Sequence, residues 1–352
     1  MTTERRNRKK MPQTFEHGSP FALESGRTVE GLRLAYTAYG RLNEARDNAV
    51  WVFHALTANS DPLEWWPGLA GPGRLFDPES HFIVCANMPG SCYGSTGPLD
   101  ENPATKRPYF GDFPFFTPRD MARAYRPLRD ALGIRRMAVG IGGSMGGQQL
   151  LEWAAEEPEA FECIIPIATN ARHSAWGRAF NASQRMCIEA DPTWGLPNAK
   201  AGIEGMKVAR SVALLSYRHY RTYEATQKDV PGGIQGFRSE SYQRYQGEKL
   251  AARFNAYSYH ALTSGMDAHD LGRSRGPIDE VLAGIGGSCL SIGIDTDLLF
   301  PVEEQEWLAQ RIPKGRFAML ESMYGHDGFL LEYAQLENII RPHLQKIRPD
   351  LF

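Results

Sequence analysis

Apolar residues along the chain fall mostly into short, nearly continuous runs, with one stretch of clear alternation at residues 32–40. The alternation predicts a half-buried strand, and the continuous runs predict buried strands spaced as in successive βα units. These buried strands are predicted at residues 49–53, 82–85, 137–141, 163–167, 289–293 and 316–320. Apolar strands separated by helical runs are typical of a mostly parallel sheet with helices on both faces. The predicted fold class is therefore α/β.

The strand pattern stops after residue 170 and resumes after residue 275. The segment between is rich in Arg, Tyr and Gln, contains amphipathic runs such as residues 208–215, and has no clear strand. A helix is predicted to close the chain at residues 331–344. The predicted organisation is a core of residues 21–170 and 276–352, with residues 171–275 as an inserted helical lid.

The first ten residues carry five basic side chains, and no apolar segment follows them. A secretory signal peptide requires such a segment, so we do not expect one here. We predict instead that residues 1–20 form a disordered basic arm.

The composition excludes several classes of function. The chain has 352 residues, and 39 Lys and Arg against 41 Asp and Glu give a net charge of -2, so neither nucleic acid nor an anionic membrane is an expected partner. No stretch approaches the roughly 20 apolar residues of a membrane span. The five cysteines are scattered without a C-x-x-C pair, which argues against a disulfide framework and against a zinc site. We expect a cytoplasmic protein with no metal site.

The most informative motif is Gly-Gly-Ser-Met-Gly at residues 142–146, between a predicted strand and a helical run at residues 148–155. A strand, a sharp glycine-flanked turn with one serine, and a helix together form the nucleophile elbow of α/β-hydrolases. The turn holds the serine in a strained conformation, and its small neighbours allow the chain to pass closely. We predict Ser144 as a nucleophile. The alternative is an ordinary glycine-rich βα turn.

A serine nucleophile needs a histidine base and a carboxylate that orients the base. On this scaffold the acid and the histidine follow the serine in that order, each on a loop after a late strand. His326 lies in a loop after the last predicted strand, whereas His343 lies in the closing helix and is expected at the surface. Both Asp295 and Asp297 directly follow a strand, and the pattern alone does not decide between them.

The same chemistry needs two backbone N–H groups that stabilise a developing oxyanion. One is expected from Met145, the residue after the nucleophile, and the other from the loop at residues 53–58 after an early strand. In that loop Leu56 or Ala55 is the candidate donor. We interpret His54 as a structural brace of the loop.

Two charged residues would suit an amino acid as acceptor. A zwitterion needs a cation for its carboxylate and an anion for its ammonium group. Arg210 lies on the amphipathic run of the lid, and Asp327 is adjacent to His326. Each charge alone is typical of a solvated or structural side chain, so the pair is a hypothesis that rests on the position of Asp327.

Taken together, these motifs resemble the homoserine O-acyltransferase family, whose members have the α/β-hydrolase fold. The resemblance extends over nearly the whole chain from about residue 32. It rests on His-Ala-Leu-Thr at 54–57, the Gly-rich loop at 90–98, Gly-Gly-Ser-Met-Gly-Gly at 142–147, Met-Asp-Ala-His-Asp at 266–270, Asp-Leu-Leu-Phe-Pro at 297–301 and Tyr-Gly-His-Asp at 324–327.

The resemblance implies that Asp297 completes a triad with Ser144 and His326, and that Arg210 and Asp327 bind the substrate. It implies a ping-pong reaction of methionine biosynthesis, in which acetyl-CoA acylates Ser144 and L-homoserine then accepts the acetyl group. It also implies a homodimer with contacts through the lid, and no cofactor besides the acyl-CoA substrate.

Departures from the family pattern leave the donor and the acceptor open. Ala58 stands where a glycine is expected, and residues 227–247 do not match the family. Succinyl-CoA as donor and serine or another alcohol as acceptor are therefore alternatives. A plain esterase or thioesterase with the same triad is a further alternative function. A non-catalytic binding protein on this fold is the last alternative, although all three triad residue types occur in catalytic order.

Overall fold

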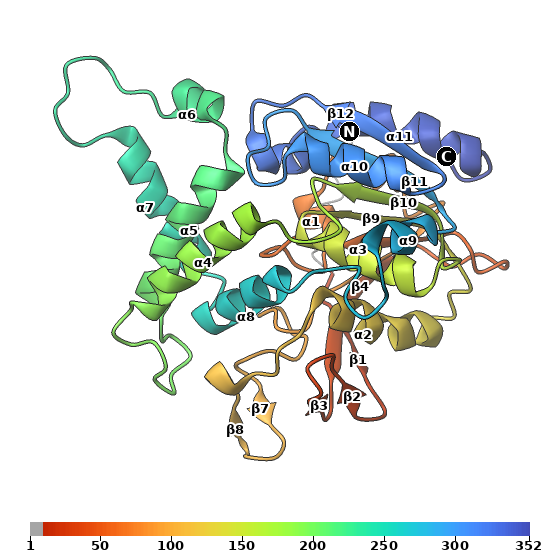
Figure 1. Cartoon of the computed structure of the whole chain (residues 1–352), viewed down its shortest axis with the longest axis horizontal. Helices are drawn as coiled ribbons and strands as arrows, with labels where there is room; N and C mark the ends of the chain where they lie inside the picture. The colour runs from red at the N-terminus through yellow and green to blue at the C-terminus, as the bar shows by residue number, and fades with distance from the viewer. Residues whose placement is uncertain (1–9) are drawn as a thin grey trace, which may run out of the picture.

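The central sheet contains eight strands within residues 10–352, the part of the chain that the computed structural model describes (Figure 1). Their order is β1-β4-β6-β5-β9-β10-β11-β12. The strands from β6 to β12 in this order are parallel, whereas β4 runs antiparallel to both β6 and β1. The strands are Gln13–Glu16 (β1), Arg33–Tyr39 (β4), Ala49–Phe53 (β5), Phe82–Ala86 (β6), Met137–Gly143 (β9), Phe161–Ile167 (β10), Ser288–Ile294 (β11) and Gly315–Leu320 (β12).

All of the predicted strands are present, and the prediction of a mostly parallel α/β sheet is confirmed. The most informative difference lies in β9, which continues through Gly142 and Gly143, residues that the sequence assigned to the turn. Gly143 pairs with Ile167 of the neighbouring strand. The sheet therefore supports the backbone up to the residue before Ser144.

The prediction of a disordered arm over residues 1–20 is wrong for Gln13–Glu16. This segment is β1, which pairs with β4 so that Gln13 lies opposite Tyr36. The strand escaped prediction because its side chains are mostly exposed and give no apolar pattern. Its pairing comes from the backbone groups that the edge of β4 offers. Residues 1–9, which carry most of the basic side chains, lie outside the described residues.

Helices cover both faces of the sheet (Figure 1). One face packs against α2, α3, α9 and α10 and contains the buried rings of Trp51 and Trp153 in edge-to-face contact. The other face packs against α1 and α11 and buries Trp66. The helices are Pro62–Trp65 (α1), Pro118–Ala131 (α2), Met145–Glu156 (α3), Ile278–Ala283 (α9), Val302–Arg311 (α10) and Tyr333–Ile347 (α11).

The closing helix is present as α11, but the prediction that His343 lies at the surface is wrong. Its side chain is buried, and its Nε2 lies 3.1 Å from the Ser288 hydroxyl. Leu336, Ile340 and Leu344 are buried on the same helix. Spacings of three, four and seven residues place His343 on this inner face.

Residues 171–275, all of them described, form the helices that were predicted as a lid. These are Ala175–Glu189 (α4), Ile203–Tyr217 (α5), Tyr220–Thr226 (α6), Arg238–Ala251 (α7) and Ala256–Asp267 (α8). They lie to one side of the sheet (Figure 1). Helix α5 packs against α4 and α7, and it also contacts the 3₁₀ turn η2 (Gly325–Leu330), which carries His326.

The remaining elements are short, and they lie outside the sheet and the lid. They are the hairpin strands Phe21–Ala22 (β2), Thr28–Val29 (β3), Glu101–Asn102 (β7) and Arg107–Pro108 (β8), and the 3₁₀ turn Phe110–Asp112 (η1). Within residues 10–352, none of the helices is both long enough and apolar enough to cross a bilayer.

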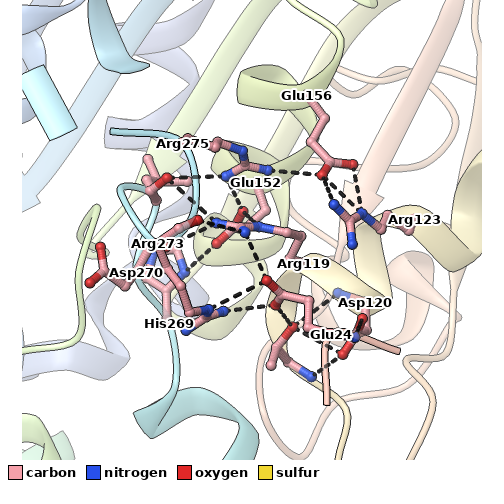
Figure 2. A network of polar contacts seen from close by, with 12 residues as sticks. Glu24, Arg119, Asp120, Arg123, Glu152, Glu156, His269, Asp270, Arg273 and Arg275 are labelled. Atoms are coloured by element: carbon pink, nitrogen blue, oxygen red, sulfur yellow. Dashed lines mark hydrogen bonds and ion pairs between the residues drawn. The ribbon is translucent and has the colours of Figure 1, made fainter. Parts of the chain in front are cut away.

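A buried ionic network joins the end of the lid segment to the helix that follows Ser144 (Figure 2). Its centre is Glu152 on α3, which is fully buried and accepts hydrogen bonds from Arg119 at 2.9 Å and from Arg275 at 2.6 Å. Arg119 also donates to Glu24 near the N-terminus at 2.7 Å. We call this group the Glu152 network; its members are Glu24, Arg119, Arg123, Glu152, Glu156, His269, Arg273 and Arg275.

Every arginine of the Glu152 network has a carboxylate partner. Arg273 pairs with Glu24 at 2.7 Å, and both Arg123 and Arg275 pair with Glu156, at 2.6 and 3.1 Å. Burial alone would raise the pKa of Glu152, but His269, Arg275 and Arg119 lower it to about 2. Glu152 is therefore charged at neutral pH, and it ties α2, α3 and the end of the lid together.

Candidate active site

Ser144 forms the turn between β9 and α3, with backbone angles φ 57° and ψ −128°. A positive φ is strained for a residue with a side chain, so the surrounding structure must hold it. The N–H of Ser144 donates to the carbonyl of Ile167 at 2.9 Å, and the hydroxyl of Thr169 donates to the carbonyl of Ser144 at 2.8 Å. Both partners come from the end of β10 or the residues just after it, so the neighbouring strand fixes the strained turn.

The first turn of α3 lies directly against the end of β5. A Cβ atom at Gly146 would come within 2.2 Å of the carbonyl oxygen of Phe53, so no side chain fits there. Phe53 is also the first residue of the loop at 53–58, which the sequence proposed for the oxyanion hole. The close approach that Gly146 permits therefore brings the elbow and this loop together.

His326 and Asp297 are in direct contact. The imidazole Nδ1 lies 2.6 Å from Oδ2 of Asp297, and the other carboxylate oxygen accepts the N–H groups of Leu299 and Phe300 at 2.8 and 3.0 Å. An ionised carboxylate only accepts, so Nδ1 carries the proton and Nε2 remains available as a base. This is the arrangement in which a carboxylate orients a catalytic histidine.

The environment of His326 favours proton binding. Burial lowers its pKa, but the charge of Asp297, the hydrogen bond to Asp297 and the charge of Asp327 together raise it above the ordinary value. The ring stacks on Phe300 with centroids 5.2 Å apart and contacts Tyr217 of the lid at 5.7 Å. Packing therefore fixes the ring plane, and the carboxylates stabilise the imidazolium that a base catalyst forms.

Asp295, the other aspartate that the pattern left open, has a different partner. Its Oδ1 accepts the N–H of Ser322 at 2.8 Å, and this bond joins the loops after β11 and β12. Thr296 strengthens the same junction because its hydroxyl donates to the carbonyl of Ser322 at 2.6 Å. Asp295 therefore braces the two loops, while Asp297 faces the histidine.

One aromatic ring links the elbow to the histidine. A Cβ atom at Gly143 would lie 2.5 Å from the ring of Phe329, so this ring packs on the backbone next to Ser144. The same ring meets His326 edge to face, with centroids 5.5 Å apart. Residues distant in the sequence thus share a packing partner that sets their relative position.

The two backbone groups proposed for the oxyanion hole are free to bind a ligand. Among the described residues, neither the N–H of Leu56 nor that of Met145 has an acceptor. Met145 is the first residue of α3, where the helix itself supplies no partner. Unpaired N–H groups at a helix start suit a negatively charged oxygen.

The prediction that His54 braces the loop is confirmed. Met88 donates its N–H to Nε2 of His54 at 3.1 Å, so the proton lies on Nδ1, which donates to the carbonyl of Ala55 at 2.9 Å. Burial lowers the pKa of His54 to about 4, although the bond to Ala55 opposes the shift. The neutral ring therefore fixes the backbone immediately before Leu56.

A cleft of about 680 Å³ adjoins these loops and contains both predicted substrate-binding charges. Arg210 projects from α5 and lies over the ring of Tyr217 at 5.4 Å, and Tyr217 in turn contacts His326. Asp327 lines the same cleft and pairs through Oδ2 with Arg218 at 2.8 Å. The cleft thus offers opposite charges close to the histidine.

Comparison with known proteins gives a consistent result. The α/β-hydrolase fold family matches residues 48–333. The homoserine O-acetyltransferase of Cyclobacterium marinum is 48% identical over 320 residues, which cover 91% of each chain. The chain belongs to the homoserine O-acetyltransferase family. It is accordingly an acyltransferase with the α/β-hydrolase fold, and the resemblance noted in the sequence is confirmed.

Solved structures of similar fold include both a transferase and an esterase. The homoserine O-acetyltransferase of Bacillus anthracis superimposes with a TM-score of 0.87, at 23% identity over 96% of both chains. Esterase E22 gives a TM-score of 0.85, at 23% identity over 95% of this chain and 99% of that one. Likeness at this level of identity shows the fold alone.

Sequence reasoning gave no role to Arg218, the ion-pair partner of Asp327 in this acyltransferase. The sequence does show that Arg218 follows Arg210 by eight residues, about two turns of a helix, which would place both arginines on one face if the helix continued. This spacing was insufficient because α5 ends at Tyr217, and Arg218 already has an extended backbone that turns toward η2. The pair joins a lid residue to the loop of His326.

Proposed function

We propose that the protein transfers an acetyl group from acetyl-CoA to the hydroxyl of L-homoserine, in methionine biosynthesis, through an acyl-Ser144 intermediate. One observation carries the proposal. The contact between His326 and Asp297 lies next to a cleft that is lined by a cation, Arg210, and an anion, Asp327, as a zwitterionic acceptor requires. The names of similar proteins, such as the homoserine O-acetyltransferase of Cyclobacterium marinum, support the same acceptor.

In the first half-reaction, His326 takes the hydroxyl proton of Ser144 at Nε2, and the Ser144 oxygen attacks the thioester carbonyl. Negative charge develops on the carbonyl oxygen, which the N–H groups of Leu56 and Met145 stabilise. The tetrahedral intermediate collapses, the C–S bond breaks, and His326 returns its proton to the CoA sulfur. Asp297 stabilises the imidazolium throughout and keeps the ring in the required tautomer.

In the second half-reaction, Arg210 binds the carboxylate of homoserine and Asp327 binds its ammonium group. Arg218 contacts Asp327 through Oδ2 at 2.8 Å, and a carboxylate has about four acceptor sites, so an ammonium group can bind beside the guanidinium. His326 then takes the proton of the substrate hydroxyl, whose oxygen attacks the acyl carbonyl. The bond from that carbonyl to the Ser144 oxygen breaks, and His326 returns the proton to Ser144. Water and homoserine compete for the same acyl-enzyme. Homoserine is favoured because Arg210 and Asp327 hold its hydroxyl in the orientation for attack.

We also propose that the lid forms the contact of a homodimer. Helices α5 and α7 of the lid expose large apolar side chains, with Val208 and Leu215 on α5 54% and 57% exposed and Tyr245 on α7 60% exposed. Val208 and Leu215 are seven residues apart and so share a face of α5, and exposed apolar side chains on a shared face are typical of a protein interface. Sedimentation of the purified chain at increasing concentration tests this state.

The alternative is an esterase that uses the same residues, because water can attack an acyl-serine in place of an alcohol. The deciding measurement is CoA release from acetyl-CoA with and without L-homoserine, with succinyl-CoA and L-serine in parallel and S144A as the inactive control. The proposal expects release that requires homoserine and acetyl-CoA. Equal release without any amino acid would contradict it and would also remove the proposed roles of Arg210 and Asp327.

A further inference from the structure

The cleft carries more positive charge than a single amino acid requires. It is lined by four basic residues and two carboxylates, a net charge of +2, whereas the whole chain has a net charge of -2. The basic residues are Arg210, Arg218, Lys249 and Arg253, and the carboxylates are Glu64 and Asp327. Such a local excess attracts an anionic ligand.

The proposed acceptor accounts for only part of this charge. Arg218 is neutralised by Asp327, and Arg210 is partly buried over Tyr217, near the histidine. Glu64 accepts a hydrogen bond from Asn59 at 3.2 Å. Lys249 and Arg253 remain. Both are exposed, and among the described residues neither has a carboxylate partner.

Arg253 is held in place by neutral groups alone. Its guanidinium donates to the carbonyl of Thr57 and to the hydroxyl of Tyr93, and a longer bond of 3.4 Å reaches the hydroxyl of Thr57. These partners fix the side chain without cancelling its charge. Because Thr57 follows Leu56, a fixed and uncompensated cation lies next to the proposed oxyanion loop.

Lys249 adds a second cation to the lining of the cleft. It lies in the last turn of α7, four residues before Arg253, and both residues line the cleft. An ammonium group on a flexible stem binds phosphate as a point charge, and a guanidinium binds it through directed N–H groups. Together they suit a ligand with several phosphate oxygens better than a single carboxylate.

We propose that Lys249 and Arg253 form a subsite for the phosphate groups of the acyl-CoA donor. The inference rests on the proposed function, because it is the CoA thioester that brings phosphates to this cleft. The exposed mouth holds the nucleotide end, and the thioester end reaches Ser144. The subsite does not contact the acyl group, so it selects CoA esters over simple esters without choosing between acetyl and succinyl.

The test compares two donors with the variant Lys249→Gln. Acetyl-CoA carries the phosphates, whereas S-acetylpantetheine has the same thioester and lacks the nucleotide end. We expect K249Q to raise KM for acetyl-CoA about three- to tenfold, the range for one charge-assisted contact at an exposed site. KM for S-acetylpantetheine and KM for homoserine should stay unchanged. Added salt should weaken acetyl-CoA binding less in K249Q than in the unaltered protein.

Two further variants serve as controls. Lys249→Arg keeps the charge and should leave KM for acetyl-CoA near that of the unaltered protein. Arg244→Gln removes another exposed cation of α7, which pairs with Glu240 at 2.9 Å outside this cleft. The subsite is refuted if K249Q changes the two donors equally or leaves both unchanged. Unaltered protein without homoserine-dependent turnover of acetyl-CoA would instead overturn the proposed function, and this subsite with it.

Discussion

The Glu152 network and the cleft beside Asp327 both gather arginines and carboxylates, but their charges are balanced differently. In the network every arginine has a carboxylate partner, and Glu152 at its centre is fully buried. In the cleft three cations, Arg210, Lys249 and Arg253, have no carboxylate partner among the described residues.

Burial explains the difference. An unpaired charge in the interior is costly, so the buried network must be fully paired to persist. The cleft is open to water, which solvates an unpaired cation until a ligand replaces the water. Under the proposed function, the same residue types therefore support the scaffold in one region and receive substrates in the other. Substitutions should accordingly change stability in the network and kinetics in the cleft.

The largest kinetic effect is expected from Ser144→Ala, the substitution of the proposed nucleophile. Loss of the nucleophile should lower the rate of homoserine-dependent CoA release by about 10⁴-fold or more, because the triad acts as one unit. The free energy of unfolding should change by less than about 0.5 kcal/mol, since the substitution removes one hydroxyl. Activity within tenfold of the unaltered protein would mean that another group carries the acyl intermediate.

The converse test is Glu152→Gln in the network. The variant keeps the shape of the side chain but leaves Arg119 and Arg275 without the buried charge between them. We expect the free energy of unfolding to fall by about 3–5 kcal/mol, the usual cost of breaking a buried ion pair. Denaturant unfolding measures this change, and the rate per folded molecule should remain within a few-fold of the unaltered rate.

A matched substitution separates burial from charge. Glu337→Gln breaks the pair with Arg341 on α11, whose side chains are 30% and 35% exposed. Exposed pairs of this kind contribute about 0.2–1 kcal/mol. Equal destabilisation by E152Q and E337Q would contradict the view that burial makes the Glu152 network structural.

The sequence predicted the fold and the elbow better than it predicted the partners of individual charged residues. The sheet and the elbow were accessible because apolar runs and the motif at residues 142–146 are local signals. Asp295 and Asp297 could not be separated by pattern, since both follow β11. What distinguishes them is three-dimensional: Asp297 accepts the N–H groups of Leu299 and Phe300 and so turns toward His326.

The long-range contacts gave no local signal. The Glu152 network combines residues from Glu24 to Arg275, and none of its members stands out in a sequence window. Arg218 and Asp327 likewise meet only because α5, which precedes Arg218, packs against η2, which contains Asp327. Strand β1 was missed for a related reason, as backbone pairing at an edge needs no apolar pattern.

The smallest expected effect concerns the pH dependence of the first half-reaction. Burial lowers the pKa of His326, but Asp297 and the charge of Asp327 raise it above the ordinary value, so the neutral base is lost as the pH falls through this raised pKa. Below it, the rate of acyl-enzyme formation should fall about tenfold per pH unit. Asp327→Asn removes one source of the increase, so the acidic limb should move to lower pH.

The measurement is the burst of nitrophenol from p-nitrophenyl acetate without homoserine, which separates this effect from acceptor binding. A limb that stays in place would show that Asp327 acts on the acceptor alone, and a limb that moves to higher pH would contradict the direction assigned to its charge. A shift to lower pH with unchanged thermal stability would place this carboxylate with the kinetic charges of the cleft.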